Sequence, residues 1–284
     1  MEGAMSLKVF IVFCSPAGST RAVGHMIRDY FSGRGVPVET LDIGEKGDSG
    51  PFVKHLHDAG KNTLVFVGSP VYKDLAIPPV MGFVDRLTSD GAFAVPFVTW
   101  GQACSGLALW QLGQGLIARG FRLAGAAKVL AVHSMMWSSE NPAGFGHPDR
   151  KDRELLLNLL ENLMASFEAG TMADLDTDVL DYQPAELAMG IKERINDPLV
   201  PMPKRVNQDA CTQCGLCAET CPVSAIALSP FPEFLSSCFG CFSCVKECPE
   251  GAIEPSVPLT QVETMIQTRI ETIGETPGTR MFMP

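Results

Sequence analysis

The chain has 284 residues, a hydrophobic fraction of 46% and a formal net charge of −10 at pH 7. This length predicts one large and one small domain. The acidic balance argues against nucleic acid as a partner, because phosphate binding requires a basic surface. No apolar run is long enough to cross a bilayer, and the opening residues lack the basic segment of an export signal. We therefore expect a cytoplasmic protein without a membrane span.

The first 170 residues alternate short apolar runs with longer amphipathic segments. Strands that each lead into a helix predict an α/β fold, a doubly wound parallel five-stranded sheet covered on both faces. Such a sheet binds ligands beyond the carboxyl ends of its strands. The runs rich in Val, Phe and Ile predict strands at 8–14, 37–43, 62–68, 92–100 and 127–135. The amphipathic stretches predict helices at 22–31, 80–87, 107–117 and 153–167.

Small and hydroxyl-bearing residues follow the first predicted strand, at 15–20, and lead into a helix expected to begin near Thr20. Backbone N–H groups and hydroxyls at such a helix start suit a phosphate. Two further loops, after the third and fourth strands, carry Tyr72 and Trp100. Each aromatic side chain is compatible with stacking on a ring or with a half-buried position at a strand end.

These loops resemble those of flavodoxins, whose phosphate loop reads S/T-x-T-G-x-T. Ser15, Gly18 and Thr20 match that pattern, whereas Ala17 replaces the usual threonine. The loops after the third and fourth strands resemble the two flavin loops of the same family. The resemblance implies an FMN site. The residues that would bind the cofactor are Ser15, Ala17, Gly18, Ser19, Thr20, Pro70, Val71, Tyr72, Thr99, Trp100, Gly101 and Gln102.

Eight of the ten cysteines form a spacing pattern that occurs twice. Each copy reads C-x2-C-x2-C-x3-C-P, and every cysteine of the second copy lies 27 residues after its counterpart. A zinc ribbon uses only two C-x2-C pairs and leaves the remaining cysteines unexplained. A disulfide framework implies export, for which the sequence shows no signal. The spacing therefore indicates iron–sulfur ligation.

The doubled pattern resembles bacterial-type ferredoxins with two [4Fe–4S] clusters, in which the fourth cysteine of each copy binds the other cluster. This resemblance implies that Cys211, Cys214, Cys217 and Cys248 hold the first cluster, and that Cys238, Cys241, Cys244 and Cys221 hold the second. The whole chain resembles proteins that fuse a flavodoxin-like domain to such a ferredoxin. The implied domains are a flavodoxin-like FMN-binding domain (5–170), an acidic linker (171–207), a small α+β 2[4Fe–4S] ferredoxin domain (208–255) and a C-terminal tail with a short helix (256–284).

Several segments outside these motifs allow two interpretations. Half of the net charge lies on 171–200, which is either a solvated linker with one short helix near 184–195 or a docking surface for a basic redox partner. The segment 135–148 is a surface loop, a lid or a docking surface. The periodic stretch 262–273 predicts a helix that packs back on a domain or, less simply, binds a partner.

The remaining candidate residues give weaker signals. Cys14 is expected to be a small buried side chain, and Cys104 is either a reactive thiol near the flavin loop or a structural residue. The five histidines show no metal-binding spacing. Gly113-x-Gly115-x-x-Ala118 follows no strand, so it does not indicate a dinucleotide site.

Together these features predict an electron-transfer flavo–iron–sulfur protein with two [4Fe–4S] clusters and one FMN. It would relay electrons between the clusters and the flavin for redox partner proteins and couple one-electron with two-electron steps. One alternative is an FMN-dependent reductase that acts on a small molecule or on a cofactor held by a partner. Another is a ferredoxin whose flavodoxin-like domain is an empty docking platform. A homodimer is left open.

Overall fold

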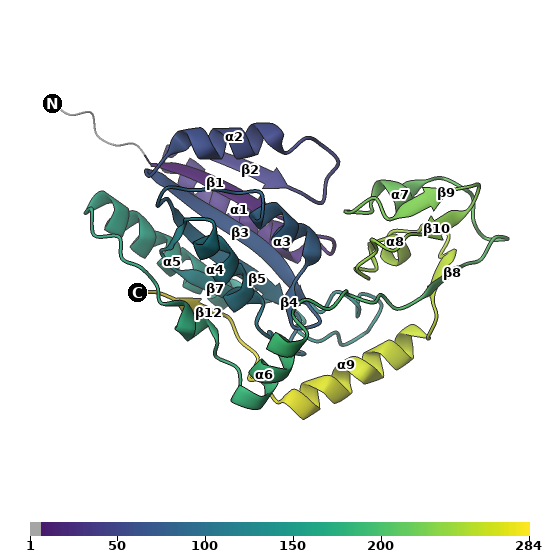
Figure 1. Cartoon of the computed structure of the whole chain (residues 1–284). Coiled ribbons are helices and arrows are strands. Elements are labelled where there is room, and N and C mark those ends of the chain that lie inside the picture. The colour runs from purple at the N-terminus through teal and green to yellow at the C-terminus, as the bar shows by residue number, and fades with distance from the viewer. Residues whose placement is uncertain (1–6) are drawn as a thin grey trace.

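The computed structural model describes residues 7–284 (Figure 1). The expected start of the first domain at residue 5 and the expected lack of an export signal concern residues outside this range. Within residues 7–284 no helix has both the length and the apolar character needed to span a membrane.

A mainly parallel sheet forms the centre of the N-terminal part (Figure 1). Its strands follow the order β2-β1-β3-β5-β7, and these five pair in parallel. This is the 2-1-3-4-5 order of the flavodoxin-like doubly wound fold, so the predicted fold class is confirmed. The strands are β1 (Lys8–Phe13), β2 (Val38–Asp42), β3 (Thr63–Tyr72), β5 (Phe93–Trp100) and β7 (Ala126–Leu130), with short additions β4 (Leu75–Ala76) and β6 (Arg122–Leu123).

Helices cover both faces of the sheet because side chains of successive strand residues point to opposite faces. In β1, Ile11 and Phe13 pack under α1 and α5, whereas Phe10 and Val12 pack under α2, α3 and α4. The helices are α1 (Ser19–Ser32), α2 (Gly50–Ala59), α3 (Pro78–Val84), α4 (Ala108–Ala118) and α5 (Arg150–Glu168). Of these, α2 was not predicted. Its buried face consists of only Phe52 and Leu56, which is too short an apolar stripe to stand out.

The expected linker contains the 3-10 helix η1 (Thr177–Leu180) and the helix α6 (Ala185–Glu193), close to the short helix predicted near 184–195. Its last residues form a strand, β8 (Lys204–Val206), which pairs antiparallel with β11 (Ile253–Pro255). Residues 204–206 are therefore part of the cysteine-rich unit, a name we use for residues 204–255. The sequence did not reveal this strand because a three-residue run has no readable alternation.

The cysteine-rich unit is built from two copies of one backbone pattern, 27 residues apart. The helices α7 (Leu216–Glu219) and α8 (Ser243–Lys246) correspond, as do the strands β9 (Ile226–Leu228) and β11. The remaining strand, β10 (Pro232–Phe234), pairs with β9 as β8 pairs with β11. Three backbone positions with positive φ also repeat at this spacing: Gln213 and Gly240, Gly215 and Phe242, and Ser224 and Gly251.

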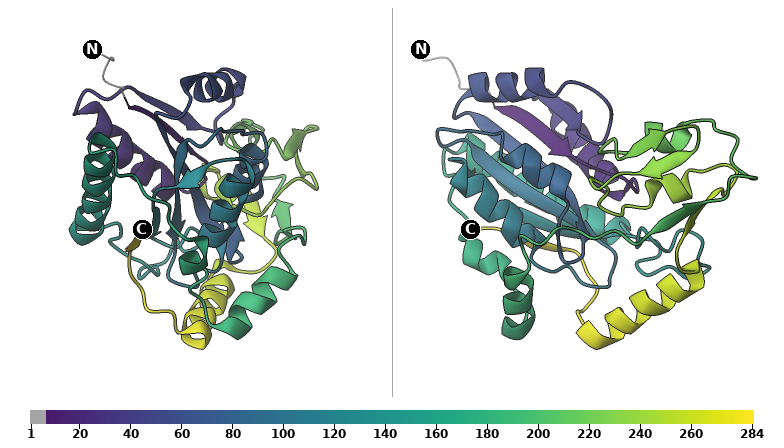
Figure 2. Two further views of the ribbon diagram at one scale, coloured as in Figure 1. Left: turned by 60° about the vertical axis from the view of Figure 1, so that its left-hand side comes forward. Right: turned by 45° about the vertical axis from the view of Figure 1, so that its right-hand side comes forward.

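The C-terminal segment returns from the cysteine-rich unit to the sheet (Figure 2). The helix α9 (Leu259–Ile273) runs past the carboxyl edge of the sheet, and β12 (Arg280–Phe282) then pairs antiparallel with β7. Val262 and Ile266 of α9 are buried against Met136 and Ala143. The predicted helix therefore packs back on the flavodoxin-like part, and the segment 135–148 provides part of its docking surface.

A buried polar group holds the C-terminal segment in place. Glu275 accepts hydrogen bonds from Lys128 Nζ at 2.6 Å, from the Ser105 N–H at 2.8 Å and from Gln183 Nε2 at 3.2 Å. The side chains of Lys128 and Glu275 are only 8% and 12% exposed. Burial alone would raise the pKa of Glu275, but the hydrogen bonds from Lys128 and Ser105 outweigh it and hold the pKa below its usual value.

We expect Glu275→Gln to lower the free energy of unfolding by about 3 kcal/mol, because it leaves the buried Lys128 ammonium without its counter-ion. The measurement is urea denaturation of anaerobically prepared protein at pH 7. The control is Glu271→Gln on the exposed side of α9, where Gln267 is the carboxylate's one side-chain partner within residues 7–284. Equal losses of stability in the two variants would contradict the role assigned to Glu275.

The ion pair between Glu275 and Lys128 also predicts that the free energy of unfolding depends on pH. The folded-state pKa of Glu275 is depressed, so its stabilising contribution is present above the ordinary glutamate pKa of about 4.3 and is lost as pH falls through the lower folded value. The difference in stability between the native protein and Glu275→Gln should therefore shrink below about pH 4. A difference that stays constant down to pH 3 would show that the carboxylate charge is not involved.

Candidate functional site

A cavity of about 390 Å³ lies at the carboxyl edge of the sheet, where β1, β3, β5 and β7 end. Parallel sheets of this order bind ligands at this place, because the strand order reverses between β1 and β3. Of the twelve residues predicted to bind the cofactor, all except Gly18 and Gln102 line the cavity. The structure thus brings together three loops that are far apart in the sequence.

The loop between β1 and α1 presents free hydrogen-bond donors. Gly18 has a φ of +93°, and a Cβ added there would meet no atom within 4 Å, so this glycine is required for its backbone conformation and not for space. The Ser15 hydroxyl accepts from the Arg21 N–H at 2.9 Å. Within the described chain, the N–H groups of Ala17, Ser19 and Thr20 donate to no acceptor. These three donors at a helix start are available to an anion.

The hydroxyl of Thr20 links two of the cavity loops. Its Oγ1 lies 2.7 Å from Thr99 Oγ1, and both residues are buried. This hydrogen bond joins the start of α1 to the end of β5. A hydroxyl in this pair can turn toward a ligand and still keep one partner, since each oxygen both donates and accepts.

The two predicted aromatic residues have different surroundings. The Tyr72 hydroxyl is buried and has no hydrogen-bond partner within 3.5 Å in residues 7–284, although Ser134 is near enough to oppose part of the increase in pKa that burial causes. Because burial dominates and raises its pKa, the hydroxyl remains a protonated donor. Trp100 is 1% exposed, its indole Nε1 donates to the Gly278 carbonyl at 3.3 Å, and Lys128 Nζ lies 4.4 Å from its ring centroid. Trp100 therefore anchors the C-terminal segment as well as lining the cavity, whereas Tyr72 has a polar atom left to offer a ligand.

The Gln102 side chain does not line the cavity but hydrogen-bonds to the loop that follows β7. Its Oε1 accepts from the Gly144 N–H at 2.9 Å, which ties the end of β5 to the segment 131–149. Next to it, a Cβ on Gly101 would lie 2.6 Å from His133 Cα, so the two loops touch through backbone. Burial lowers the pKa of His133 to about 4, and this cavity-lining imidazole is therefore neutral at pH 7.

The wall of the cavity opposite the sheet was not predicted. Phe239, Gly240 and Phe242 of the cysteine-rich unit form one part of it, and Val262 and Ile266 of α9 form another. The Phe239 ring lies 6.1 Å from the Tyr72 ring. The sequence offered one signal for this wall: Phe239 and Phe242 stand beside Cys238 and Cys241. Large aromatic side chains in a loop are usually buried against another part of the chain.

An ionic group borders the cavity near α9. Asp74 is buried, has a φ of +73° and accepts from Arg194 at 2.5 Å and from Arg269 at 2.6 Å. The carboxylate thus joins the β3–β4 turn to the end of α6 and to α9. Gly106 packs directly on this turn, since a Cβ added to it would lie 2.1 Å from the Asp74 carbonyl oxygen.

The second cysteine set (Cys221, Cys238, Cys241 and Cys244) lies close to the cavity wall formed by Phe239, Gly240 and Phe242. Cys221 and Cys238 are near enough to Cys241 for their charge to raise its pKa, although burial is the larger cause and brings it to about 11. Cys244 is buried, and its pKa rises to about 12. Cys221 belongs to the first copy of the motif in sequence but lies with the second copy in space.

The first cysteine set is more accessible. Cys214 is exposed and Cys211 is partly exposed, whereas Cys217 is buried. The fourth cysteines of the two copies have matching contacts, since the Ala225 N–H donates to Cys221 Sγ at 3.2 Å and the Ala252 N–H donates to Cys248 Sγ at 3.3 Å. All eight cysteines are free of disulfides.

The two remaining cysteines are buried. Cys14 directly follows β1 and packs in the core cluster that also contacts Tyr72 and Cys241, and burial raises its pKa. Burial likewise raises the pKa of Cys104 to about 12. A thiol that stays protonated at neutral pH is a poor nucleophile, which favours the structural interpretation of Cys104.

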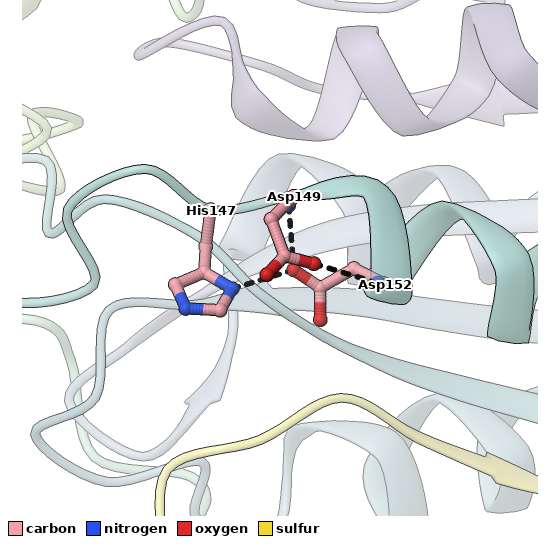
Figure 3. A group of neighbouring side chains, drawn as sticks. All are labelled: His147, Asp149 and Asp152. Carbon is pink, nitrogen blue, oxygen red and sulfur yellow. Dashed lines mark hydrogen bonds and ion pairs between the residues drawn. The ribbon is translucent and has the colours of Figure 1, made fainter.

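One group of side chains has the composition of a metal site but forms a helix cap (Figure 3). Asp149 precedes α5, accepts from the Asp152 N–H at 2.9 Å and donates its own N–H to Asp152 at 2.7 Å, which is a capping box. His147 Nδ1 lies 2.5 Å from the same Asp152 carboxylate. These contacts account for the carboxylates without a metal ion.

The cysteine-rich part of the chain is similar to known iron–sulfur proteins. Residues 210–253 match a family model described as a 4Fe-4S dicluster domain. A stretch of 80 residues is 33% identical to Polyferredoxin protein MvhB of Methanothermobacter marburgensis, and a second protein of that name from Methanothermobacter thermautotrophicus matches equally. This stretch covers 28% of the chain but only 17% of the length of the polyferredoxin.

The N-terminal part was compared with solved structures. A flavodoxin from the domain Archaea is 18% identical, with a TM-score of 0.44, and the match covers 57% of this chain and 99% of that one. Oxidised flavodoxin 2 from Bacillus cereus is 16% identical, with a TM-score of 0.43, over 56% of this chain and 99% of that one. The fold assignment itself rests on the strand order. The chain thus joins a flavodoxin-like domain to a 4Fe–4S dicluster domain, as predicted, a combination that points to electron transfer.

We expect Gly106→Ala to destabilise the protein markedly, because the new Cβ would displace the Asp74 turn in addition to the strain of a residue with a φ of +54°. Gly35→Ala is the matched control, since Gly35 has a φ of +73° but open space around it, so only the backbone cost of about 1 kcal/mol applies. Thermal unfolding midpoints of the two variants make the comparison. Similar midpoints would mean that the contact between Gly106 and Asp74 is unimportant.

Proposed function

We propose that the protein is an electron-transfer flavo–iron–sulfur protein that binds two [4Fe–4S] clusters and one FMN. The observation that carries this proposal is the shared wall between the cysteine-rich unit and the cavity: Phe239, Gly240 and Phe242 line the cavity and flank Cys241 in sequence. A group held by the second cysteine set and a ligand in the cavity would therefore be neighbours.

The cysteines fit two clusters by number, spacing and surroundings. None of the eight forms a disulfide, and backbone N–H groups donate to Cys221 and Cys248, the type of hydrogen bond that tunes iron–sulfur centres. Cys211, Cys214, Cys217 and Cys248 would hold the first cluster. Cys238, Cys241, Cys244 and Cys221 would hold the second.

The cavity fits a flavin mononucleotide by its donors and its shape. The free N–H groups of Ala17, Ser19 and Thr20 suit the phosphate, with the Ser15 and Thr20 hydroxyls beside them. Pro70, Val71 and Tyr72 from β3, with Thr99, Trp100 and Gly101 from β5, would surround the ring, and the unpartnered Tyr72 hydroxyl can donate to one of its polar atoms. Gly18 would contribute the backbone turn that directs the donors, and Gln102 would position its loop.

When bound, the clusters supply one-electron exchange and the flavin supplies one- or two-electron exchange. The residues that surround the cavity determine which partners can reach it. Val262, Ile266 and the cysteine-rich unit cover the cavity, whereas Cys214 is exposed, so a partner protein can approach the first cysteine set directly. Neutral His133 and protonated Tyr72 add no charge to the ring pocket at pH 7.

A reductase that acts on a small molecule is a second candidate, because a covered cavity rather than an open flavin edge is what that alternative requires. Asp74, Arg194 and Arg269 border the cavity and could orient a polar substrate. Addition of a substrate to the flavin-loaded protein would then perturb the flavin spectrum. A spectrum unaffected by small polar acceptors, with rapid exchange to a redox protein, would favour the relay.

The cofactor content is the first test. Anaerobically purified and reconstituted protein should contain about eight irons and one FMN per chain, given two four-iron motifs and one phosphate loop. Cys221→Ser should lower the iron content toward four, because it removes a ligand of the second set only. Cys104→Ser, the control, should leave the iron content unchanged. Four irons in the native protein would exclude two clusters. Absence of flavin after FMN addition would favour the alternative in which the flavodoxin-like domain is an empty docking platform.

The phosphate loop is tested by Thr20→Val, which has nearly the same shape and lacks the hydroxyl. FMN affinity should fall about tenfold or more, because a hydrogen bond to a charged group contributes about 1.5–3 kcal/mol. Fluorescence titration of the apoprotein with FMN provides the affinity, and an iron content equal to that of the native protein shows that the variant is folded. Thr88→Val, at an exposed position outside the cavity, is the control. Unchanged affinity in Thr20→Val would count against this loop as the phosphate site.

A further inference from the structure

A lysine distinguishes one strand pair of the cysteine-rich unit from the other. In the first half Leu228 pairs with Pro232, and in the second half Pro255 pairs with Lys204. Leu228 and Pro255 are equivalent positions 27 residues apart, so Lys204 and Pro232 occupy equivalent places in the two strand pairs. The duplication therefore puts a cation in one strand pair and an uncharged ring at the equivalent place in the other.

The ammonium of Lys204 is directed at the second cysteine set. Its Nζ lies 3.5 Å from Cys238 Sγ, 4.9 Å from the centroid of the Phe234 ring and 5.4 Å from that of Phe242. Its charge also acts on Cys241 and Cys244, where it opposes the increase in pKa caused by burial. The side chain is thus surrounded by sulfur atoms and aromatic faces.

No carboxylate neutralises this charge. Among residues 7–284, Lys204 forms no ion pair, and no other lysine or arginine donates to any of the eight motif cysteines. Lys246, on the neighbouring helix α8, pairs with Glu247 at 3.3 Å instead. An uncompensated cation beside partly buried sulfur atoms acts more strongly than one in water, because the local dielectric constant is lower.

We propose that Lys204 makes the second iron–sulfur centre the easier of the two to reduce. This inference rests on the proposed function. Reduction adds one negative charge to a centre, and a nearby ammonium stabilises the more negative form, which raises the reduction potential. The first centre has Pro232 at the equivalent place and receives no such stabilisation.

A difference in reduction potential between the two centres would give electron transfer a preferred direction. An electron shared between the two centres resides preferentially on the second, which lies beside the cavity wall of Phe239, Gly240 and Phe242. The first centre, with exposed Cys214, is the one that a redox partner can approach. The charge of Lys204 therefore biases electrons from the outside of the molecule toward the cavity.

The test is an anaerobic redox titration, followed by electron paramagnetic resonance, of protein that contains eight irons. Lys204→Gln keeps an N–H donor and removes the charge. We expect the midpoint of one centre to fall by an amount that corresponds to about a tenfold decrease in its one-electron reduction equilibrium, or about 59 mV. The midpoint that falls should belong to the centre whose signal is lost in Cys221→Ser, and the other should shift much less.

Lys246→Gln is the matched control, since it removes a lysine of the same unit that is already paired with a carboxylate. Unchanged midpoints in Lys204→Gln, or equal shifts at both centres, would overturn the proposal. An equal effect of Lys246→Gln would do the same, because it would reduce Lys204 to a general surface charge. Failure of the native protein to bind eight irons would instead overturn the proposed function, so the two failures are distinguishable.

Discussion

The pairing of β12 with β7 holds α6, the cysteine-rich unit and α9 in place against the sheet. Residues 169–279 leave the sheet, form α6, the cysteine-rich unit and α9, and return to the edge of the same sheet. A segment anchored at both ends loses fewer conformations on docking than a pendant domain does. The buried ion pair between Glu275 and Lys128, with Trp100 beside it, secures the returning end. The cysteine-rich unit is therefore held against the carboxyl edge, where the cavity lies.

Within that arrangement, the internal duplication of the cysteine-rich unit is used asymmetrically. One half turns toward the cavity and the other toward solvent. The clearest sign is Phe242, which adopts a φ of +63° where its counterpart is Gly215. A non-glycine residue in this conformation costs about 1–2 kcal/mol. The Phe242 ring offsets that cost by packing near Trp137 and Lys204, and it completes the cavity wall. The strain thus occurs where the two parts of the chain meet.

Local sequence patterns predicted the parts of the structure that depend on local contacts. The five parallel strands followed from their apolar runs, the helix at 259–273 from its period, and the cysteine motifs from their spacing. Three-residue strands such as β8 and β12 were not predicted, because their pairing depends on partners 51 and 156 residues away in the pairs Lys204–Pro255 and Phe282–Ala126, which local periodicity cannot show. The cavity loops were predicted, whereas its outer wall and the place of Lys204 depend on how the two units dock. Trp100 shows the same limit, because the sequence could not reveal that its indole bonds to Gly278.

The position of β12 in the chain has a consequence for biosynthesis. Chains fold as they emerge from the ribosome, with N-terminal units first. The five parallel strands and both cysteine loops are therefore synthesised before the strand that closes the assembly. During that interval the carboxyl edge and the sulfur atoms are open, and bulky prosthetic groups can be inserted without unfolding any core. Once β12 has paired, release of a group from behind α9 requires a local opening of the C-terminal segment. Retention of the proposed prosthetic groups would then depend on how often that segment detaches as well as on how tightly the loops bind them.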